Sequence, residues 1–330
     1  MTDILRTNLL NPIVLSFALG VFARLVRSEF TLPKDIYTGI SIFLLFGLGL
    51  KGGAELAETP MATIAAPLGV TLFLGVLTPI TAWAVLRYIG KFSESDAAGV
   101  AAHYGSVSAV TFLAAQQFVQ AMQVQDPTLP PLEGYMPTLL AALESPGIHV
   151  ALAIGALRTA HPEQKLGAVL HEVLTARTMI LLIGGLIIGY LSGHEQWEKI
   201  APFYDSKGAV FRGALCLFLL EMGVVAGSRL GDLKKVGPFL LAFGVLWPAV
   251  HGVIGAWLGV WAGLSPSGAT VLGAMAASAS YIAAPPAVRL TLPDANPTLY
   301  LTSSLAITFP FNILFGITLY FQAALWAAGR

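Results

Sequence analysis

The stretches AAGVAAHYGSVSAVT, at residues 97–111, and TVLGAMAASASYIAAPP, at residues 270–286, are polar interruptions of two long hydrophobic segments. The positions that coincide under a shift of 174 residues are Gly99 with Gly273, Ala102 with Ala276, Ser106 with Ser280, Gly49 with Gly223, Gly53 with Gly227 and Leu56 with Leu230. A hydrophobic segment that is interrupted by glycine and serine at corresponding places in two halves of a chain indicates a transporter binding site.

The composition is that of a membrane protein. Of the 330 residues, 56% are hydrophobic and 11% are charged, whereas soluble proteins carry about 25% charged residues. So few charges cannot cover a surface that faces water, so most of the surface must face lipid. The net charge of +0 gives no argument for binding nucleic acid. The single cysteine, Cys216, can form no internal disulfide, and we expect it to pack as a small apolar residue.

Ten hydrophobic segments are candidates for membrane-spanning helices, which need about 20 mostly apolar residues. They cover residues 9–25, 37–50, 62–87, 94–122, 136–157, 174–192, 209–227, 237–260, 266–288 and 299–327. We therefore predict an all-α polytopic membrane protein of ten transmembrane helices, with the fourth and ninth helices broken. The repeat divides the chain into five helices at residues 1–160 and five at residues 161–330. Because five is odd, the second set starts from the opposite side, so the repeats are inverted.

The positive charges predict the orientation. If the N-terminus is outside, 12 of the 18 Lys and Arg residues lie on the inner side and 6 on the outer side. By the positive-inside rule, this distribution favours both termini outside.

The two breaks are the first candidates for a binding site. Glycine and serine allow a helix to unwind within a membrane, and the unwound backbone then lies against protein or a water-filled cavity. The ends of half-helices present free N–H groups and a positive dipole end, which suit an anion. The hydroxyls of Ser106, Ser108, Ser278 and Ser280 can donate to an anion or bind sodium through oxygen. The alternative is close helix packing through small residues.

Glu144 is the candidate ligand for a cation. It lies in the fifth hydrophobic segment, where an ionised carboxylate without a partner is costly and therefore indicates function. Pro146 follows it and frees a nearby carbonyl as a further oxygen ligand. Thr308, at the same level of the tenth segment, and Thr111 add oxygen atoms. The alternative for Glu144 is a neutral, hydrogen-bonded structural role.

Other polar residues in the hydrophobic segments have structural interpretations. For Glu221 we expect a pairing with a neighbouring arginine or a subunit contact. His103, His149 and His251 stand singly, and we expect each to be a hydrogen-bonded packing residue. The stretches LKGGAELAE and AGSRLGDLKKVG, after the second and seventh segments, are interpreted as hinges or surface turns.

The sequence gives no support for an enzyme. It contains no HExxH or CxxC motif and no clustered His and Cys residues, so no metal beyond sodium is expected. It also lacks a P-loop of the form GxxxxGK[ST], which argues against ATP-driven transport by this chain alone. An intramembrane hydrolase with Ser106 or Ser108 as the nucleophile would need a nearby base, and only His103 is close in sequence.

Three strings carry a resemblance to a known family. They are GSVSAVT at residues 105–111, GSRLGDLKKVGPFLLAFGVLWPAVHG at residues 227–252 and AASASYIAAPPAVRLTLPDANPTLY at residues 276–300. With these strings, and over essentially its whole length, the chain resembles the sodium-dependent bicarbonate permeases of the cyanobacterial SbtA type.

The resemblance implies ten spans in a five-plus-five inverted repeat, a gate part and a core part, sodium symport and a homotrimer in a bacterial cytoplasmic (inner) membrane. It also implies a PII-like regulator of the SbtB type, although the connection at residues 158–173 is shorter than the charged loop of cyanobacterial members. By motif, Gly105, Ser106, Ser108, Ser278 and Ser280 would contact substrate or sodium, and Glu144 takes the place of an aspartate.

The second break departs from the family pattern. The expected string is close to SSSDISGPP, whereas this chain has SASYIAAPP at residues 278–286. Tyr281 therefore stands in place of an acid, and Ala283 and Ala284 replace a Ser-Gly pair. These changes alter the charge and size of the pocket and affect the expected sodium stoichiometry and substrate.

The function we predict is sodium-coupled import of bicarbonate or a similar small monovalent anion, by elevator-type movement of the core part. The predicted substrate ligands are Gly105, Ser106, Ser108, Ser278, Ser280 and Tyr281. The predicted sodium ligands are Glu144, Ser106, Thr111, Ser280 and Thr308. The alternatives are a sodium- or proton-coupled organic-anion carrier with a fold like the bile-acid symporters, and a membrane sensor that does not transport.

Overall fold

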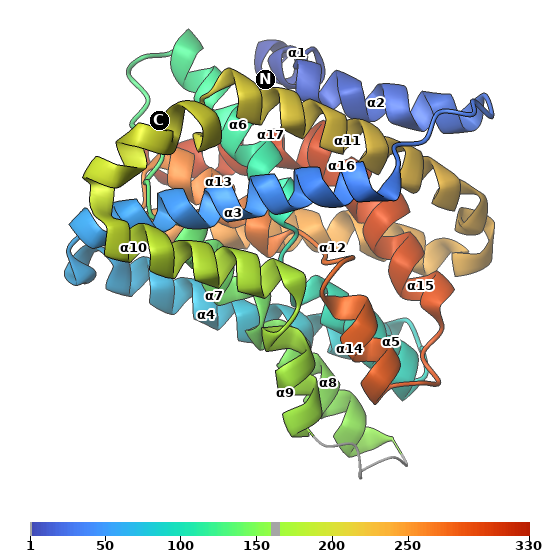
Figure 1. Cartoon of the computed structure of the whole chain (residues 1–330). Helices are drawn as coiled ribbons and strands as arrows, with labels where there is room; N and C mark the ends of the chain where they lie inside the picture. Colours follow the sequence, from blue (N-terminus) through green and yellow to red (C-terminus); the bar gives the residue numbers. More distant parts are fainter. Residues whose placement is uncertain (1, 160–165) are drawn as a thin grey trace.

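The computed structural model describes residues 2–159 and 166–330, and every regular element in these two ranges is helical (Figure 1). Within them, seven helical stretches are long and apolar enough to cross a membrane. These are Lys34–Glu58, Met61–Ile89, Glu94–Gln125, Met136–Arg158, Arg177–Tyr204, Ala209–Trp261 and Pro297–Ala327. The prediction of an all-α protein with many membrane-spanning helices is therefore confirmed.

The bounds of the helices follow the ten hydrophobic segments. The first half contains α1 (Thr2–Leu9), α2 (Pro12–Leu25), α3 (Lys34–Glu58), α4 (Met61–Ala84), α5 (Glu94–Tyr104), α6 (Ala109–Gln125), α7 (Met136–Glu144) and α8 (Pro146–Arg158). The second contains α9 (Leu166–Leu174), α10 (Arg177–Tyr204), α11 (Ala209–Arg229), α12 (Leu233–Trp261), α13 (Pro266–Ala276), α14 (Ala284–Thr291), α15 (Pro297–Thr302), α16 (Phe309–Phe311) and α17 (Ile317–Ala327). Short 3-10 or π turns connect some of them: η1 (Val85–Ile89), η2 (Leu230–Asp232), η3 (Ser303–Thr308) and η4 (Asn312–Gly316).

The predicted count of ten differs from seven for identifiable reasons. The stretch Ala209–Trp261 holds both α11 and α12, the apolar helix α2 has 14 residues, and the ninth segment is divided into the short helices α13 and α14. The sixth predicted segment ended at residue 192, and α10 has a kink at Gly193, whose φ of 71° is left-handed. Glycine adopts this backbone conformation without a steric penalty.

Both predicted breaks are present, and the fifth segment has one as well. The fourth segment is not helical between Tyr104 and Ala109, and the fifth is interrupted at Ser145 between α7 and α8. The ninth segment is not helical between Ala276 and Ala284. We expected the Pro285–Pro286 pair to lie in this break, but it forms the first turn of α14. Proline is favoured there because the first N–H groups of a helix have no partner within it.

Glycines bring two pairs of helices into close contact. A Cβ atom added to Gly223 of α11 would lie 2.9 Å from Cα of Gly20 in α2, and one added to Gly49 of α3 would lie 2.9 Å from Cα of Gly185 in α10. Small residues allow helix backbones to approach in this way in membranes. The first stretch that we interpreted as a hinge or surface turn, residues 50–58, is instead a continuation of α3, and Gly53 packs against α10.

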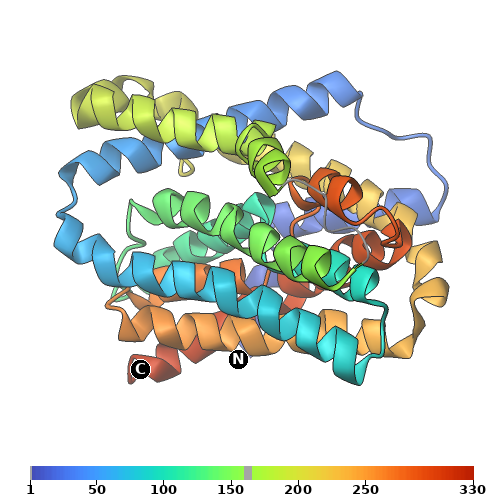
Figure 2. The ribbon, with the colours of Figure 1, turned by 90° about the horizontal axis from the view of Figure 1, so that it is seen from below.

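The helix contacts of the two halves follow the same scheme. Helix α2 packs on α11, and α3 packs on α10. In the first half, α4 packs on α5 and α8, and α5 packs on α8; in the second, α12 packs on α13 and α17, and α13 packs on α17. Figure 1 shows most of the long helices running side by side, and the two termini lie near one another in both views (Figures 1 and 2).

Candidate functional site

The two breaks cross and bond directly to each other. The backbone N–H of Ser280 donates to the carbonyl oxygens of His103 at 2.8 Å and Ser106 at 3.1 Å. In the opposite direction, the backbone N–H of Ser108 donates to Oγ of Ser278 at 2.8 Å. Unwound backbone inside a membrane must be satisfied within the protein, and each break satisfies part of the other.

Serine hydroxyls also begin the half-helices that follow the breaks. Oγ of Ser108 accepts a hydrogen bond from the backbone N–H of Thr111 and caps α6. Oγ of Ser280 accepts from the backbone N–H of Ala283, just before α14. The Ser108 bond satisfies a donor that the first turn of α6 leaves free, whereas α14 has no side-chain cap.

Gly105 and Gly147 hold the first break against the fifth segment. A Cβ atom on Gly147 would collide with the carbonyl oxygen of Gly105, and one on Gly105 would lie 2.9 Å from Cα of Gly147. Oγ of Ser106 donates to the carbonyl oxygen of Glu144 at 2.8 Å. The carbonyl that the first break binds is that of Glu144, at the interruption between α7 and α8, and not that of Ala142, which lies four residues before Pro146.

The carboxyl group of Glu144 is buried beside these contacts. Its residue is 3% exposed. Among the described residues, no Lys, Arg or His forms an ion pair with it. Thr178 of α10 lies beside it, but Oγ1 of Thr178 makes no hydrogen bond of good geometry. The Glu144 carboxyl group therefore has no counter-charge among the described side chains.

Glu144 faces a small cavity of about 30 Å³ between two groups of helices. One wall carries the oxygen-bearing side chains of Ser108, Glu144, Ser280 and Tyr281. The opposite wall comes from α3, α10 and α11, with Ser41, Leu44, Leu45, Thr178 and Phe218. Ser108 lies beside the hydroxyl of Tyr281, yet this hydroxyl is buried without a hydrogen bond of good geometry. Two hydroxyls of the cavity lining, those of Tyr281 and Thr178, are therefore buried without a hydrogen-bond partner.

The remaining predicted site residues lie around the cavity or apart from it. Gly105, Ser106 and Ser278 form the crossing and do not line the cavity. Oγ1 of Thr111 is buried without a partner one turn into α6. Thr308 lies elsewhere: its Oγ1 is 2.6 Å from the hydroxyl of Tyr104 and donates to the carbonyl oxygen of Gly244 at 2.7 Å. The structure therefore brings Ser108, Glu144, Ser280 and Tyr281 together, but not Thr308.

Sequence reasoning missed the residues that other helices supply to the site. Thr178 and Ser41 line the cavity from α10 and α3, outside both repeated stretches. Tyr320 donates to Oδ1 of Asn312 at 2.7 Å, and Nδ2 of Asn312 donates to the carbonyl oxygen of Ala277 at 2.9 Å. Asn312 was noticeable as a polar residue in an apolar segment, but only the fold shows that it supports the second break.

The other intramembrane polar residues have structural partners. Glu221 accepts a hydrogen bond from the backbone N–H of Leu32 at 2.9 Å, and no arginine among the described residues forms an ion pair with it, so the predicted arginine partner is wrong. His103, His149 and His251 contact Gly99, Ser145 and Thr78, respectively, at hydrogen-bonding distance. Their interpretation as packing residues is confirmed.

The fold and the site together define a multi-pass helical membrane protein with a buried polar site at the crossing of two broken helices. The model of the Na+-dependent bicarbonate transporter superfamily matches residues 12–325, and the chain belongs to this superfamily. The family resemblance seen in the sequence is therefore confirmed. A comparison with curated proteins finds no match.

Proposed function

We propose that the protein imports bicarbonate, or a similar small monovalent anion, together with sodium. The observation that carries this proposal is the cavity at the crossing, where the unpartnered hydroxyls of Tyr281 and Thr178 and the buried carboxyl group of Glu144 line the same space. Membership of a Na+-dependent bicarbonate transporter superfamily supports both ligands. The family describes transport and not catalysis, and we propose no catalytic residue.

The anion would bind at the ends of the half-helices. Ala109 and Val110, in the first turn of α6, line the cavity, so the positive dipole end of this helix faces it. The hydroxyls of Ser108, Ser280 and Tyr281 would donate to its oxygens. Gly105, Ser106 and Ser278 would act by fixing the two breaks. The cavity of about 30 Å³ suits a small anion better than an organic anion, because pockets for drug-sized ligands measure about 300–1,000 Å³.

Sodium, the coupling ion, would neutralise Glu144. Sodium is a hard cation that prefers oxygen ligands, and the hydroxyls of Ser106, Ser280 and Thr111 lie in the same part of the fold as the carboxylate. Thr308 keeps its predicted role only if the tenth helix shifts toward the crossing. An anion beside a bound cation avoids the cost of two unpaired buried charges, so binding of one favours binding of the other.

The movement we propose is that of an elevator. Ten helices would cross the membrane as two inverted sets of five, which the recurring helix contacts support. Helices α2, α3, α10 and α11 would form the gate part and the remaining spans the core part. The cavity lies between them, since Ser108 and Ser280 face Ser41 and Phe218 across it. Sliding the core along the gate would carry the cavity from one side to the other.

The setting that we propose comes from the sequence. The chain would lie in a bacterial cytoplasmic membrane with both termini outside, and three copies would form a homotrimer. A PII-like regulator would bind the inner face. The connection at residues 158–173, where such a regulator is expected to dock, lies partly outside the described residues.

Ligand-dependent thermal unfolding of the purified protein tests the site. A ligand that binds only the folded state raises the unfolding temperature. We expect bicarbonate to raise it in sodium chloride but not in choline chloride, and bile acids to have no such effect. Stabilisation by a bile acid and not by bicarbonate would favour the organic-anion carrier. Stabilisation by bicarbonate without flux into vesicles would favour a sensor.

A further inference from the structure

A second, larger polar cavity lies at the far end of α6 from the crossing. Its volume is about 130 Å³. The polar side chains that line it are Lys51, Glu55, Gln116, Gln120, Gln123, Glu133 and Lys207. Gln116 follows Ser108 by eight residues, which places it about 12 Å along the helix axis from the crossing. The cavity is thus separate from the site around Glu144.

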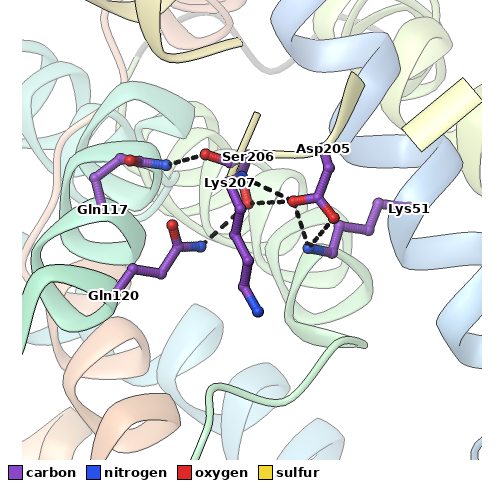
Figure 3. Close-up of polar contacts among 6 residues, drawn as sticks. All are labelled: Lys51, Gln117, Gln120, Asp205, Ser206 and Lys207. Atoms are coloured by element: carbon purple, nitrogen blue, oxygen red, sulfur yellow. Dashed lines mark hydrogen bonds and ion pairs between the residues drawn. The ribbon is translucent and has the colours of Figure 1, made fainter. Parts of the chain in front are cut away.

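One basic side chain of the cavity lining, Lys51, is neutralised by an ion pair. Nζ of Lys51 lies 3.1 and 3.2 Å from the two carboxylate oxygens of Asp205 (Figure 3). Oδ1 of Asp205 also accepts from the backbone N–H of Lys207 at 2.8 Å. The side chain of Lys207 is exposed. Lys51 therefore brings little free positive charge to the cavity.

The amide nitrogens of three glutamines of α6 also donate hydrogen bonds. Nε2 of Gln117 donates to the carbonyl oxygen of Ser206 at 2.7 Å, and Nε2 of Gln120 donates to Oγ of Ser206 at 3.1 Å (Figure 3). Nε2 of Gln123 donates to the carbonyl oxygen of Pro130 at 2.8 Å. These bonds fix the orientation of the three side-chain amides, and they use the nitrogen atoms and not the oxygen atoms.

The groups that lack partners are acceptors. Oε1 of Gln116 and Oε1 of Gln120 are buried without a hydrogen bond, in residues that are 3% and 7% exposed. Glu55 contributes a carboxylate that forms no ion pair with any described residue. Glu133 adds a second carboxyl group, which accepts from the backbone N–H of Ser265 at 2.6 Å. Buried oxygen atoms without a hydrogen-bond donor favour a cation, and two carboxylates repel an anion. Besides Glu55 and Glu133, the one charged group of the lining that forms no ion pair with a described residue is the exposed ammonium of Lys207.

We propose that this cavity binds a sodium ion, held by the amide oxygens of Gln116 and Gln120 and by the carboxylate of Glu55. A hard monovalent cation takes such oxygen ligands and keeps part of its water in a cavity of this size. The inference deepens the proposed function and rests on it only for the identity of the cation. It adds a sodium site at the far end of α6 from the crossing, apart from the site at Glu144.

Equilibrium binding of 22Na+ to the purified protein tests this site. In a Glu144→Gln background, which removes the carboxylate of the crossing, saturable sodium binding should remain. Adding Gln116→Leu should weaken it by about tenfold, the effect of losing one ligand to a charged group. Adding Gln116→Glu should strengthen it, because a carboxylate replaces the amide oxygen. Gln125→Leu, which alters another glutamine of α6 outside this cavity, is the matched control and should change nothing.

Either of two results would contradict the proposed sodium site. If Glu144→Gln protein binds no sodium, or if Gln116→Leu binds it as tightly as its parent, the cavity holds water only and the proposal is wrong. If Gln116→Leu does not yield folded protein by size-exclusion chromatography, Glu55→Gln takes its place with the same expected weakening. Failure of the proposed function gives a different result: bicarbonate flux does not depend on a sodium gradient, although 22Na+ binding is intact.

Discussion

The backbone N–H of Ser280 donates a hydrogen bond to the carbonyl oxygen of Ser106 across 3.1 Å. These two residues occupy the same position of the sequence repeat, one in each break. The breaks are thus in contact with each other and do not form two separate sites. Because each break supports the other, a change in either should affect the shared cavity.

Replacing Glu144 with Gln should reduce the effect of sodium on stability. The variant keeps the shape of the side chain but loses a buried charge, which is costly without a partner. Its unfolding temperature in choline chloride should be equal to or above that of the wild type, and sodium chloride should raise it by less than in the wild type, because only the cavity at Gln116 still binds sodium. Glu221→Gln is the control, because Glu221 already accepts a hydrogen bond from Leu32. If sodium chloride raises the unfolding temperature of Glu144→Gln as much as that of the wild type, Glu144 is not a sodium ligand.

Replacing Tyr281 with Phe should weaken bicarbonate binding without loss of stability. The hydroxyl is buried without a partner and faces the cavity, so its removal leaves no other group unpaired. We expect about a tenfold higher bicarbonate concentration for half-maximal stabilisation and an unfolding free energy within about 0.5 kcal/mol of the wild type. Tyr300→Phe is the matched control, because its hydroxyl is also unpaired but lies outside this cavity. Equal bicarbonate responses in both variants would contradict the role of Tyr281.

Replacing Gly147 with Ala should destabilise the protein. The new Cβ atom would collide with the carbonyl oxygen of Gly105 at the first break, and overpacking of this kind costs about 1–3 kcal/mol. Thermal unfolding in detergent measures the effect. The control is Gly184→Ala in α10, where a Cβ atom has no neighbour within 4 Å and alanine should stabilise the helix by about 0.5–1 kcal/mol. If the Gly147→Ala protein is as stable as the wild type, the contact between the first break and the fifth segment does not need two glycines.

Acid should weaken the ion pair of Lys51 and Asp205 at the far end of α6. Burial favours the neutral carboxyl, but Lys51 and the backbone N–H of Lys207 outweigh it and hold the pKa of Asp205 below its ordinary value. A depressed pKa contributes stability above the unfolded value of about 3.9, and that contribution is lost as the pH falls through the folded value. Asp205→Asn should lower the free energy of unfolding by about 1 kcal/mol at pH 7. The variant's stability should also change less with pH below pH ~4 than that of the wild type. Unfolding temperatures across this range give the comparison, with Asp35→Asn as the control, because Asp35 is exposed and forms no ion pair with a described residue.

The sequence allowed the prediction of the all-α membrane class and both breaks. Serine and glycine interrupt otherwise apolar segments, and this pattern is local, so it can be read without the fold. The same pattern places Ser106 on Ser280, and these residues do meet. Gly49 and Gly223 were also matched correctly, although their role is close helix packing and not binding.

The other wall of the site could not be predicted. Thr178 and Ser41 come from helices that approach the crossing only through tertiary packing, and a single hydroxyl in an apolar helix has no distinctive signal. Thr308 was placed beside Glu144 because both lie before a proline in the fifth and tenth segments. The structure instead bonds Thr308 to Gly244 and Tyr104, because its turn η3 packs on α11 and α12, whereas α7, which carries Glu144, packs on α3, α4 and α10.

Uptake of 14C-bicarbonate into proteoliposomes tests the central claim most directly. An inward sodium gradient should drive accumulation above equilibrium, and replacing external sodium with choline should abolish it. Glu144→Gln protein should show no response to the gradient, whereas Glu221→Gln protein should behave as the wild type. Bicarbonate uptake that is equal with and without the sodium gradient would contradict sodium-coupled transport by this protein.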